Sequence, residues 1–234
     1  MAKESRSTTV ILLAGGTGTR LGGAIPKQFL PLGDRSVLQH SLDVLGACED
    51  VSEIVIVCDQ RWRAEIDLTS IDLPISFAEP GVRRQDSVYH GLQQMNGQPQ
   101  LTCIHDGARP FIDCSLVDRV IRAAEECQAA AAAIPARATI KVANQKGRVL
   151  QTLARSSLWE VQTPQVIRTD LLRLAFHHAF EENSTVTDDV ALVEAMGQSV
   201  QLVCGKDENF KITTYHDLQV ARLLLEDACV RKTS

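Results

Sequence analysis

The first residues that could do chemistry lie in a glycine-rich segment near the start of the chain. It follows an apolar run and reads Leu13-Ala14-Gly15-Gly16-Thr17-Gly18-Thr19-Arg20-Leu21-Gly22-Gly23. Glycines allow backbone N–H groups to turn toward an anion because no Cβ stands in the way. Arg20 and Lys27 add side-chain charge. The segment therefore predicts a phosphate-binding loop whose two cations stabilise charge that builds up during phosphoryl transfer.

Two well-known phosphate loops do not fit this segment. A P-loop needs Gly-Lys-Ser/Thr after four intervening residues, whereas Gly18 is followed five residues later by Gly23 and Ala24. A dinucleotide-binding loop needs a glycine where Leu21 stands. The remaining interpretation is a loop for a nucleoside triphosphate, and the alternative is a tight strand-to-helix turn with two solvated cations.

A second polar cluster, at residues 105–109, follows another apolar run. Asp106 could approach a magnesium ion that is bound to phosphates, and Arg109 could face a phosphate. The carboxyl end of a strand is also where open α/β sheets place their ligands. His105 is interpreted as a packed core histidine and is given no role.

A third cluster spans residues 81–87, where a loop enters a helix. Its N–H groups, with the Ser87 hydroxyl, could read the edge of a base. The alternative is that Asp86 and Ser87 only cap the helix, while Arg83 and Arg84 form a solvated rim.

Four later segments mix cations and hydroxyls with loop residues, which suits a phosphorylated polyol better than an apolar substrate. They are residues 155–159, 162–165, 187–189 and 209–213. The sequence has no Ser-His-Asp spacing and no setting for a reactive cysteine, so a covalent intermediate has no support.

The scaffold that must position these clusters is predicted to be α/β, with a mostly parallel sheet flanked by helices, because β-branched runs alternate with segments of helical period. Strands are expected at 8–14, 53–58, 75–77, 101–105, 129–134 and 201–204, with a last extended piece at 209–213. Helices are expected after the caps Ser36 and Asp86, from Ser115 to Cys127, from Thr169 to Phe180, from Thr187 or Asp188 to Gly197, and from Tyr215 to Cys229. Since no linker or repeat divides the chain, residues 1–234 are predicted to form a single domain.

Residues 138–153 depart from the parallel pattern. Two alternating segments flank Asn144-Gln145-Lys146-Gly147, which predicts a β-hairpin. The hairpin is either an arm that projects toward a partner chain or an edge of the main sheet.

Composition limits the partners. The 24 Lys and Arg against 29 Asp and Glu give a net charge of -5, so a nucleic-acid footprint is not expected. No apolar run reaches the ~20 residues of a membrane span, and the polar start lacks a signal-peptide core. The seven cysteines form no Cys-x-x-Cys pair, and Cys58 and Cys103 lie in strand-like runs as core residues. The expected compartment is the cytoplasm, or a plastid-like stroma if a longer precursor exists.

Taken together and in order, these motifs resemble the 2-C-methyl-D-erythritol 4-phosphate cytidylyltransferases of the non-mevalonate isoprenoid pathway. In one-letter code the matching motifs are LAGGTGTRLG, PKQFL, RRQDSV, HDGARP, RSSLW, QTPQ, TDD and NFKIT. The resemblance covers the chain from Val10 to about Leu225. It implies a Rossmann-like nucleotidyltransferase fold of the GT-A type.

The resemblance also implies a reaction. A phosphate oxygen of methylerythritol phosphate attacks the α-phosphorus of CTP in line, pyrophosphate leaves, and 4-diphosphocytidyl-2-C-methyl-D-erythritol forms. Magnesium is required and is bound mainly through the CTP phosphates, with Asp106 as a possible ligand. Arg20 and Lys27 would stabilise the transition state, and Arg155 and Lys211 would position the attacking phosphate.

The same resemblance distributes the binding residues. Those surrounding CTP would be Ala14, Gly15, Gly16, Gly18, Gly81, Val82 and Ser87. Those lining the methylerythritol phosphate site would be Asp106, Arg109, Thr139, Thr163 and Thr187, with Thr139 and Arg155 contributed across a homodimer. Val82 departs from the family, which often has an acidic residue there.

Three alternatives remain from the sequence. Ribitol-5-phosphate cytidylyltransferase shares the first loop and QTPQ, but its pattern differs at Gly107-Ala108 and at Leu158-Trp159. Sugar-1-phosphate nucleotidyltransferases share only the glycine-rich start. An inactive nucleotide-binding scaffold would have no need to retain Arg20, Lys27, Asp106 and Lys211 together.

Overall fold

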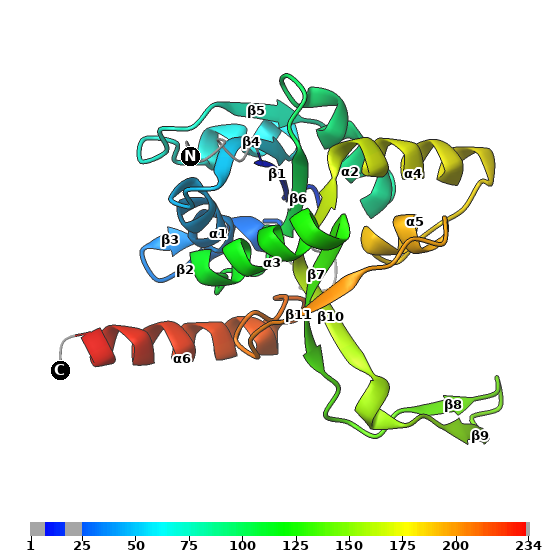
Figure 1. The fold of residues 1–234 in the computed structure, drawn as a ribbon. Coiled ribbons are helices and arrows are strands. Elements are labelled where there is room, and N and C mark those ends of the chain that lie inside the picture. The colour runs from blue at the N-terminus through cyan, green and yellow to red at the C-terminus, as the bar shows by residue number, and fades with distance from the viewer. Residues whose placement is uncertain (1–7, 17–24, 233–234) are drawn as a thin grey trace.

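A seven-stranded sheet forms the centre of the molecule, in the order β11-β7-β10-β6-β1-β4-β5. The computed structural model describes residues 8–16 and 25–232, with side chains as far as residue 227. The strands are β1 (Thr8–Leu13), β4 (Val51–Val57), β5 (Ile75–Ala78), β6 (Leu101–Asp106), β7 (Ala129–Pro135), β10 (Trp159–Arg168) and β11 (Gln201–Cys204). Only β10 runs antiparallel to its neighbours, β6 and β7. The predicted mostly parallel α/β fold is confirmed (Figure 1).

Helices cover both faces of this sheet, as the period-two alternation of buried side chains requires. In β1, Val10 and Leu12 belong to one buried cluster with α1 (Val37–Gly46) and α3 (Cys114–Cys127). Ile11 belongs to the opposite cluster, with α2 (Arg84–Gln94), α4 (Thr169–Glu181) and α5 (Val190–Glu194). The strand ends are thereby held between two packed layers.

A smaller cluster joins the C-terminal helix α6 (Tyr215–Lys232) to the strand pair β2 (Pro31–Leu32) and β3 (Arg35–Ser36). Leu32, Val37, Ile212, Leu218 and Ala221 are its buried members. The short 3-10 helices are η2 (Lys27–Phe29), η3 (Gln60–Glu65) and η4 (Arg155–Ser157). Leu30, directly after η2, and Phe210, in the segment before α6, pack against this cluster, so it holds together the segments next to Lys27 and Lys211.

The predicted hairpin is a projecting arm. Strands β8 (Lys141–Ala143) and β9 (Val149–Thr152) pair only with each other, as a separate two-stranded sheet. Figure 1 shows the arm reaching away from the body, opposite the sheet edge that carries β5. Of the two interpretations of residues 138–153, the edge of the main sheet is therefore wrong.

Helix starts were predicted with mixed success. Ser36 caps α1 by accepting a hydrogen bond from the Gln39 N–H, as expected. The predicted cap Asp86 is wrong: α2 begins at Arg84, and the Asp86 carboxylate accepts the Arg83 N–H from the third helical position. The helix expected from Ser115 to Cys127 is α3, which begins one residue earlier, at Cys114, because Asp113 caps it by accepting the Leu116 N–H.

Three later expectations need correction. Helix α5 is confined to Val190–Glu194 rather than reaching from residue 187 to Gly197, and residues 209–213 form no strand. Strand β10 was not expected, because Pro164 and polar neighbours interrupt its apolar pattern. The sheet accommodates the proline at an irregularity, where pairing with β7 shifts between Val161 and Gln165.

None of the helices that the structure describes is long and apolar enough to cross a membrane.

Candidate active site

The site forms where the carboxyl ends of neighbouring parallel strands meet. Leu13 at the end of β1 pairs with Asp106 at the end of β6, and the Gly107 N–H donates to the Leu13 carbonyl over 2.9 Å. On the other side of β1, strands β4 and β5 end together, and β5 leads into the loop at residue 81. The chain passes from β1 to β4 and β5 on one side and then returns to β6 on the other, so the strand order reverses at β1, which is where open α/β sheets bind ligands.

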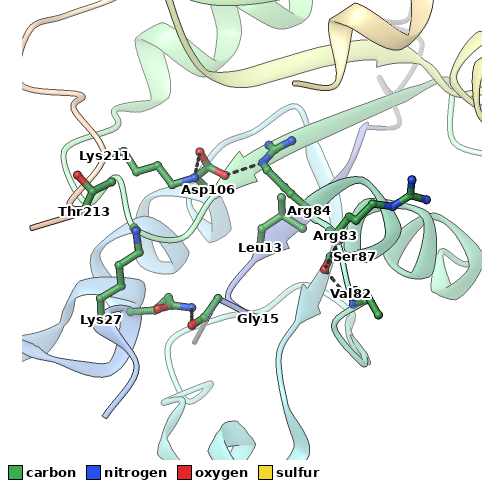
Figure 2. A pocket seen from close by; sticks show the side chains of 14 residues that line it. Leu13, Gly15, Lys27, Val82, Arg83, Arg84, Ser87, Asp106, Lys211 and Thr213 are labelled. Carbon is green, nitrogen blue, oxygen red and sulfur yellow. Dashed lines mark hydrogen bonds and ion pairs between the residues drawn. The ribbon is translucent and has the colours of Figure 1, made fainter. Parts of the chain in front are cut away.

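A cavity of about 360 Å³ opens at this edge. The residues that line it are Leu13, Gly15, Gly16, Lys27, Gln28, Gly81, Val82, Arg83, Arg84, Ser87, Asp106, Ala108, Lys211 and Thr213. Figure 2 shows Val82, Arg83 and Ser87 on one side of the cavity and Lys27, Lys211 and Thr213 on the other, with Gly15 between them. The side with Val82, Arg83 and Ser87 is the nearly neutral backbone wall of the cavity. The side with Lys27, Lys211 and Thr213 is its cationic wall.

Two glycines let the backbone close the floor of the cavity. A Cβ on Gly15 would lie 2.3 Å from the Pro80 Cβ, and one on Gly81 would lie 2.3 Å from the Asp86 Cβ. Gln28 fixes the residues after β1, because its amide donates to the carbonyls of Ala14 and Gly16 over 2.7 and 2.9 Å. The loop after β1 and the loop after β5 thus lie in direct contact.

The backbone wall is held by the Ser87 hydroxyl. It accepts a hydrogen bond from the Gly81 N–H over 2.9 Å and donates to the Arg83 carbonyl over 3.3 Å. The Val82 side chain is 100 % exposed, so this residue contributes its backbone to the cavity. A turn fixed in this way presents peptide groups in constant positions, which is what recognition of a planar polar edge needs.

On the opposite side, Asp106 gathers three cations. Its carboxylate lies 3.2 Å from Arg84 Nε, 3.0 Å from Lys211 Nζ and 3.5 Å from Arg109 Nε. Burial alone would raise the pKa of Asp106, but the charges of Arg84, Lys211 and Arg109 outweigh it and hold that pKa well below its usual range. Asp106 is therefore a permanent anion that fixes cations at the rim of the site.

Arg84 also binds a second buried carboxylate. Its guanidinium meets both oxygens of Asp189, each over 2.8 Å, in a bidentate pair. Burial would lower the pKa of Arg84, but Asp189 and Asp106 together raise it above its ordinary value. Because α2 begins at Arg84, this side chain links the backbone wall to the cationic wall.

Lys27 lies on η2 and is nearly buried. Its ammonium donates to the Ile212 carbonyl over 2.6 Å, between Lys211 and Thr213. The two lysines thus converge on one stretch of backbone although 184 positions separate them in the sequence. Two ammonium groups on one wall form a site for a polyanion.

Behind the site, His105 and Thr163 fix the backbone of Asp106. The Asp106 N–H donates to Thr163 Oγ1, which lies 3.0 Å from His105 Nδ1, and His105 Nε2 lies 3.3 Å from the Arg109 carbonyl. A neutral ring with its proton on Nε2 satisfies every one of these bonds. Burial lowers the pKa of His105 to about 4. His105 is thus a packed core histidine, as the sequence predicted.

The donor set does not fit a magnesium ion held by the protein. Within the described ranges no group of three or more His, Cys, Asp and Glu side chains could hold a metal ion. Both oxygens of Asp106 face cations, which is the opposite of what a divalent cation requires. The prediction of Asp106 as a magnesium ligand gains no support from this geometry.

The structure brings many of the predicted residues together. Those lining the cavity are Gly15, Gly16, Lys27, Gly81, Val82, Ser87, Asp106 and Lys211. Three more contact lining residues from behind: Ala14 bonds to Gln28, Arg109 to Asp106, and Thr163 to the Asp106 backbone. Gly18 and Arg20 lie outside the described residues.

Three predicted residues do not line the cavity. Thr187 is exposed in the turn before α5. Thr139 and Arg155 are exposed at the arm, where the Arg155 guanidinium donates to the Arg137 carbonyl. The roles predicted for these three residues stay predictions, because none of them lines the cavity of its own chain.

Sequence reasoning also missed residues of the site. Gln28, Arg84 and Thr213 line the cavity without having been named as site residues, and Asp189 anchors Arg84. Arg84 was interpreted only as a solvated rim. Its adjacency to a second arginine before a helix was a signal for anion binding, but its carboxylate partners lie 22 and 105 positions away and no local pattern marks them.

Comparisons with known proteins match nearly the whole chain to one family. The family described as 2-C-methyl-D-erythritol 4-phosphate cytidylyltransferase matches residues 8–227. The chain is 42 % identical over 228 residues to the chloroplastic enzyme of that name from Oryza sativa subsp. japonica, covering 97 % of this chain and 77 % of the rice protein. It is 41 % identical over 218 residues to the Chlamydia pneumoniae enzyme of that name, covering 93 % and 99 %.

Among solved structures, 4-diphosphocytidyl-2C-methyl-D-erythritol synthase from Anaerococcus prevotii superposes with a TM-score of 0.85 at 27 % identity, covering 95 % of this chain and 100 % of that one. The fold and the sequence match thus agree, and the ribitol phosphate and scaffold alternatives are not favoured. The chain belongs to the 2-C-methyl-D-erythritol 4-phosphate cytidylyltransferase family of nucleotidyltransferases.

Proposed function

We propose that the cleft binds CTP with its base against the backbone wall and its triphosphate along the loop after β1. The base would meet the peptide groups of Gly81 and Val82, whose position Ser87 fixes. The phosphates would lie beside Gly15 and Gly16, within reach of Lys27. Because the Val82 side chain carries no acceptor, recognition of cytosine at this position rests on the backbone.

The acceptor substrate, 2-C-methyl-D-erythritol 4-phosphate, would lie on the cationic wall. Lys211 and Arg109 are held there by Asp106, so their charges are in place before the phosphate arrives. An oxygen of that phosphate attacks the α-phosphorus of CTP, the new P–O bond forms, and the bond to the pyrophosphate breaks. Lys27 would stabilise the charge that grows on the phosphoryl oxygens.

The contact of Lys27 with the Ile212 carbonyl, directly beside Lys211 in the chain, is the observation that carries this proposal. Both lysines line one cavity, in which Lys27 would serve the nucleotide phosphates and Lys211 the acceptor phosphate, as a direct transfer between two phosphates requires. Arg20 would add a further cation on the nucleotide side, as the family resemblance implies. Magnesium would be bound by the CTP phosphates, since the carboxylates of the described residues do not form a magnesium site.

The arm would complete the site across a homodimer. Its apolar side chains Ile140, Val142, Val149 and Leu150 are exposed in the single chain, which is costly unless another surface covers them. Thr139 and Arg155 would then reach the acceptor site of the partner subunit. In this arrangement residues 1–234 form one catalytic domain, with 138–153 as the dimerisation arm. We expect it to act in the cytoplasm, or in a plastid-like stroma if a longer precursor exists.

Pyrophosphate release tests the proposed substrates. The chain is incubated with CTP and magnesium, and either methylerythritol phosphate or ribitol 5-phosphate is added. We expect pyrophosphate only with methylerythritol phosphate, together with the product 4-diphosphocytidyl-2-C-methyl-D-erythritol, which mass spectrometry detects. Release with ribitol 5-phosphate alone would contradict the proposal, and equal rates with CTP and UTP would contradict recognition of the base by the backbone wall.

A further inference from the structure

Two cysteines from distant parts of the chain meet behind the site. Cys48 follows the end of α1, and Cys114 is the first residue of α3, 66 positions later. Neither belongs to the cavity, and the proposed reaction uses neither. They lie on the face of the sheet where α1 and α3 pack side by side.

The two sulfur atoms are in contact. The distance between Cys48 Sγ and Cys114 Sγ is 2.7 Å, only about 0.7 Å longer than a disulfide bond. Both thiols also approach the Val44 carbonyl in the last turn of α1, over 3.1 and 3.4 Å. A bond between the sulfurs therefore needs a small local adjustment and no movement of the helices relative to each other.

The two thiols differ in exposure. Cys48 is 3 % exposed, whereas Cys114 is only partly buried at the helix start. Burial, with contributions from Cys114 and more weakly from Cys103, raises the pKa of Cys48 well above its ordinary value. A small oxidant would thus meet Cys114 first and find Cys48, as a thiol, directly behind it.

We propose that Cys48 and Cys114 are a dithiol modification site, which hydrogen peroxide converts into an intramolecular disulfide bond. In the first step the Cys114 thiol gains an oxygen atom from peroxide, giving a sulfenic acid and one water. In the second step the Cys48 sulfur displaces that hydroxyl group, which leaves as water with the Cys48 proton. Two thiols are oxidised, and one peroxide is reduced to two waters.

The bond would close a ring that contains β4, α2 and β6, and with β6 the residues Asp106 and Arg109. Ser41 on α1 already donates to the Arg109 carbonyl, so the new link would act beside an existing one. Closing a long ring restricts the unfolded chain, and for a ring of this size the melting temperature of the oxidised protein should rise by roughly 10 °C. Reduction should reverse the change.

The test uses the full chain, reduced and then treated with a small excess of hydrogen peroxide. Remaining thiols are alkylated, the protein is digested without reductant, and the peptides are identified by mass spectrometry. We expect the peptides carrying Cys48 and Cys114 to appear linked, two hydrogens lighter than the separate pair. Cys114→Ser should abolish the link, whereas Cys127→Ser, which removes an exposed thiol elsewhere on α3, should leave it intact.

The outcomes separate this proposal from other thiol chemistry. Oxidation of Cys127 and Cys204 while Cys48 and Cys114 remain fully alkylated would overturn it. A link from Cys48 to Cys103, or a link that forms only in urea, would also overturn it. So would a lower melting temperature of the linked protein, because the native geometry would then not accommodate the bond. The measurement does not depend on catalysis, so it stands apart from the proposed substrates.

Discussion

The cleft and the arm hold their polar groups in opposite ways. In the cleft, Asp106 is nearly buried and its cation partners come from α2, the loop after β6 and the segment before α6 of the same chain. On the arm, Thr139 and Arg155 are exposed, and apolar neighbours such as Leu150 stand in solvent. The charged groups of the cleft are paired with one another within one chain, whereas the apolar side chains of the arm are exposed to solvent.

This difference indicates which parts of the site one chain can preorganise. A buried carboxylate that gathers cations holds them in place before a phosphate arrives, and burial strengthens each interaction. An exposed side chain on a two-stranded arm has no such support, because an isolated hairpin is marginal in water. The arm residues would gain fixed positions only against a second surface.

Removing Asp106 should give the largest effect. Asp106→Ala leaves Arg84, Arg109 and Lys211 without their shared partner in a buried site, so the free energy of unfolding should fall by about 3–5 kcal/mol. Activity should be lost with it. Urea unfolding provides the measurement. Asp207→Ala, which removes the partner of exposed Arg137, is the matched control and should leave stability nearly unchanged. Equal losses in both variants would show that burial of the Asp106 network adds no stability.

Lys27→Ala should act on the reaction more than on binding. A cation matched to the transition state contributes there preferentially, so kcat should fall roughly 10²- to 10³-fold while the affinity for CTP falls far less. Steady-state kinetics and calorimetric titration with CTP measure the two quantities. Lys146→Ala, in the exposed turn of the arm, is the control. Equal losses in kcat and affinity would make Lys27 a binding contact only.

Mixing two inactive variants tests whether the arm serves the partner's cleft. Lys27→Ala and Arg155→Ala should each have little activity alone. In a mixed dimer, one of the two clefts would have an intact Lys27 and an intact Arg155 from the other chain. Random mixing should therefore restore about a quarter of the wild-type activity. No recovery after unfolding and refolding the mixture would place Arg155 in the cleft of its own chain, or outside catalysis.

Leu150→Asp should weaken the dimer without unfolding the chain. Leu150 is 66 % exposed on the arm, and Leu174, 58 % exposed on α4, is a matched leucine outside it. A charge placed at the centre of an apolar interface should raise the dimer dissociation constant roughly 10- to 100-fold. Light scattering over a dilution series measures this. Leu174→Asp should leave the constant unchanged, and a stable, fully active wild-type monomer would contradict the homodimer.

The smallest effect concerns pH. Because the pKa of His105 is lowered to about 4 in the folded state, the unfolded chain binds a proton at higher pH than the folded one. The stabilisation is present above about pH 6.5 and is lost as the pH falls toward 4, so the free energy of unfolding should drop by about 1–2 kcal/mol between pH 7 and 5. His105→Gln should flatten this dependence, whereas His177→Gln, on the exposed face of α4, should not.

The sequence was informative wherever a local pattern determines the structure. Apolar alternation predicted the parallel strands, and the turn residues between 144 and 147 predicted the hairpin. The positions of Asp106 and Arg109 followed from the rule that ligands bind at strand ends. The pairing of β10 with β6 and β7 was not predictable in this way, since Pro164 and its polar neighbours conceal a strand that only its partners stabilise.

The missed site residues share one property. Arg84 acquires its role from Asp106 and Asp189, and Gln28 acquires its role from the carbonyls after β1. Both roles depend on contacts across the fold, so neither residue stands out in its own segment. The matching motifs contain these two residues as well as Lys27 and Lys211, but only the lysines were given roles, because an ammonium group suits a phosphate without any partner elsewhere in the fold.

The close approach at Gly15 and Gly81 also bears on resistance to inhibitors. A Cβ on Gly15 would come within 2.3 Å of a carbon of Pro80 in the loop after β5, and one on Gly81 would come as close to a carbon of Asp86 in α2. A compound that fills the space between these two glycines would contact backbone that substitution cannot reshape without displacing a wall of the proposed nucleotide site. Mutations that exclude such a compound there would also impair the enzyme, so this part of the cleft offers an inhibitor the fewest routes of escape.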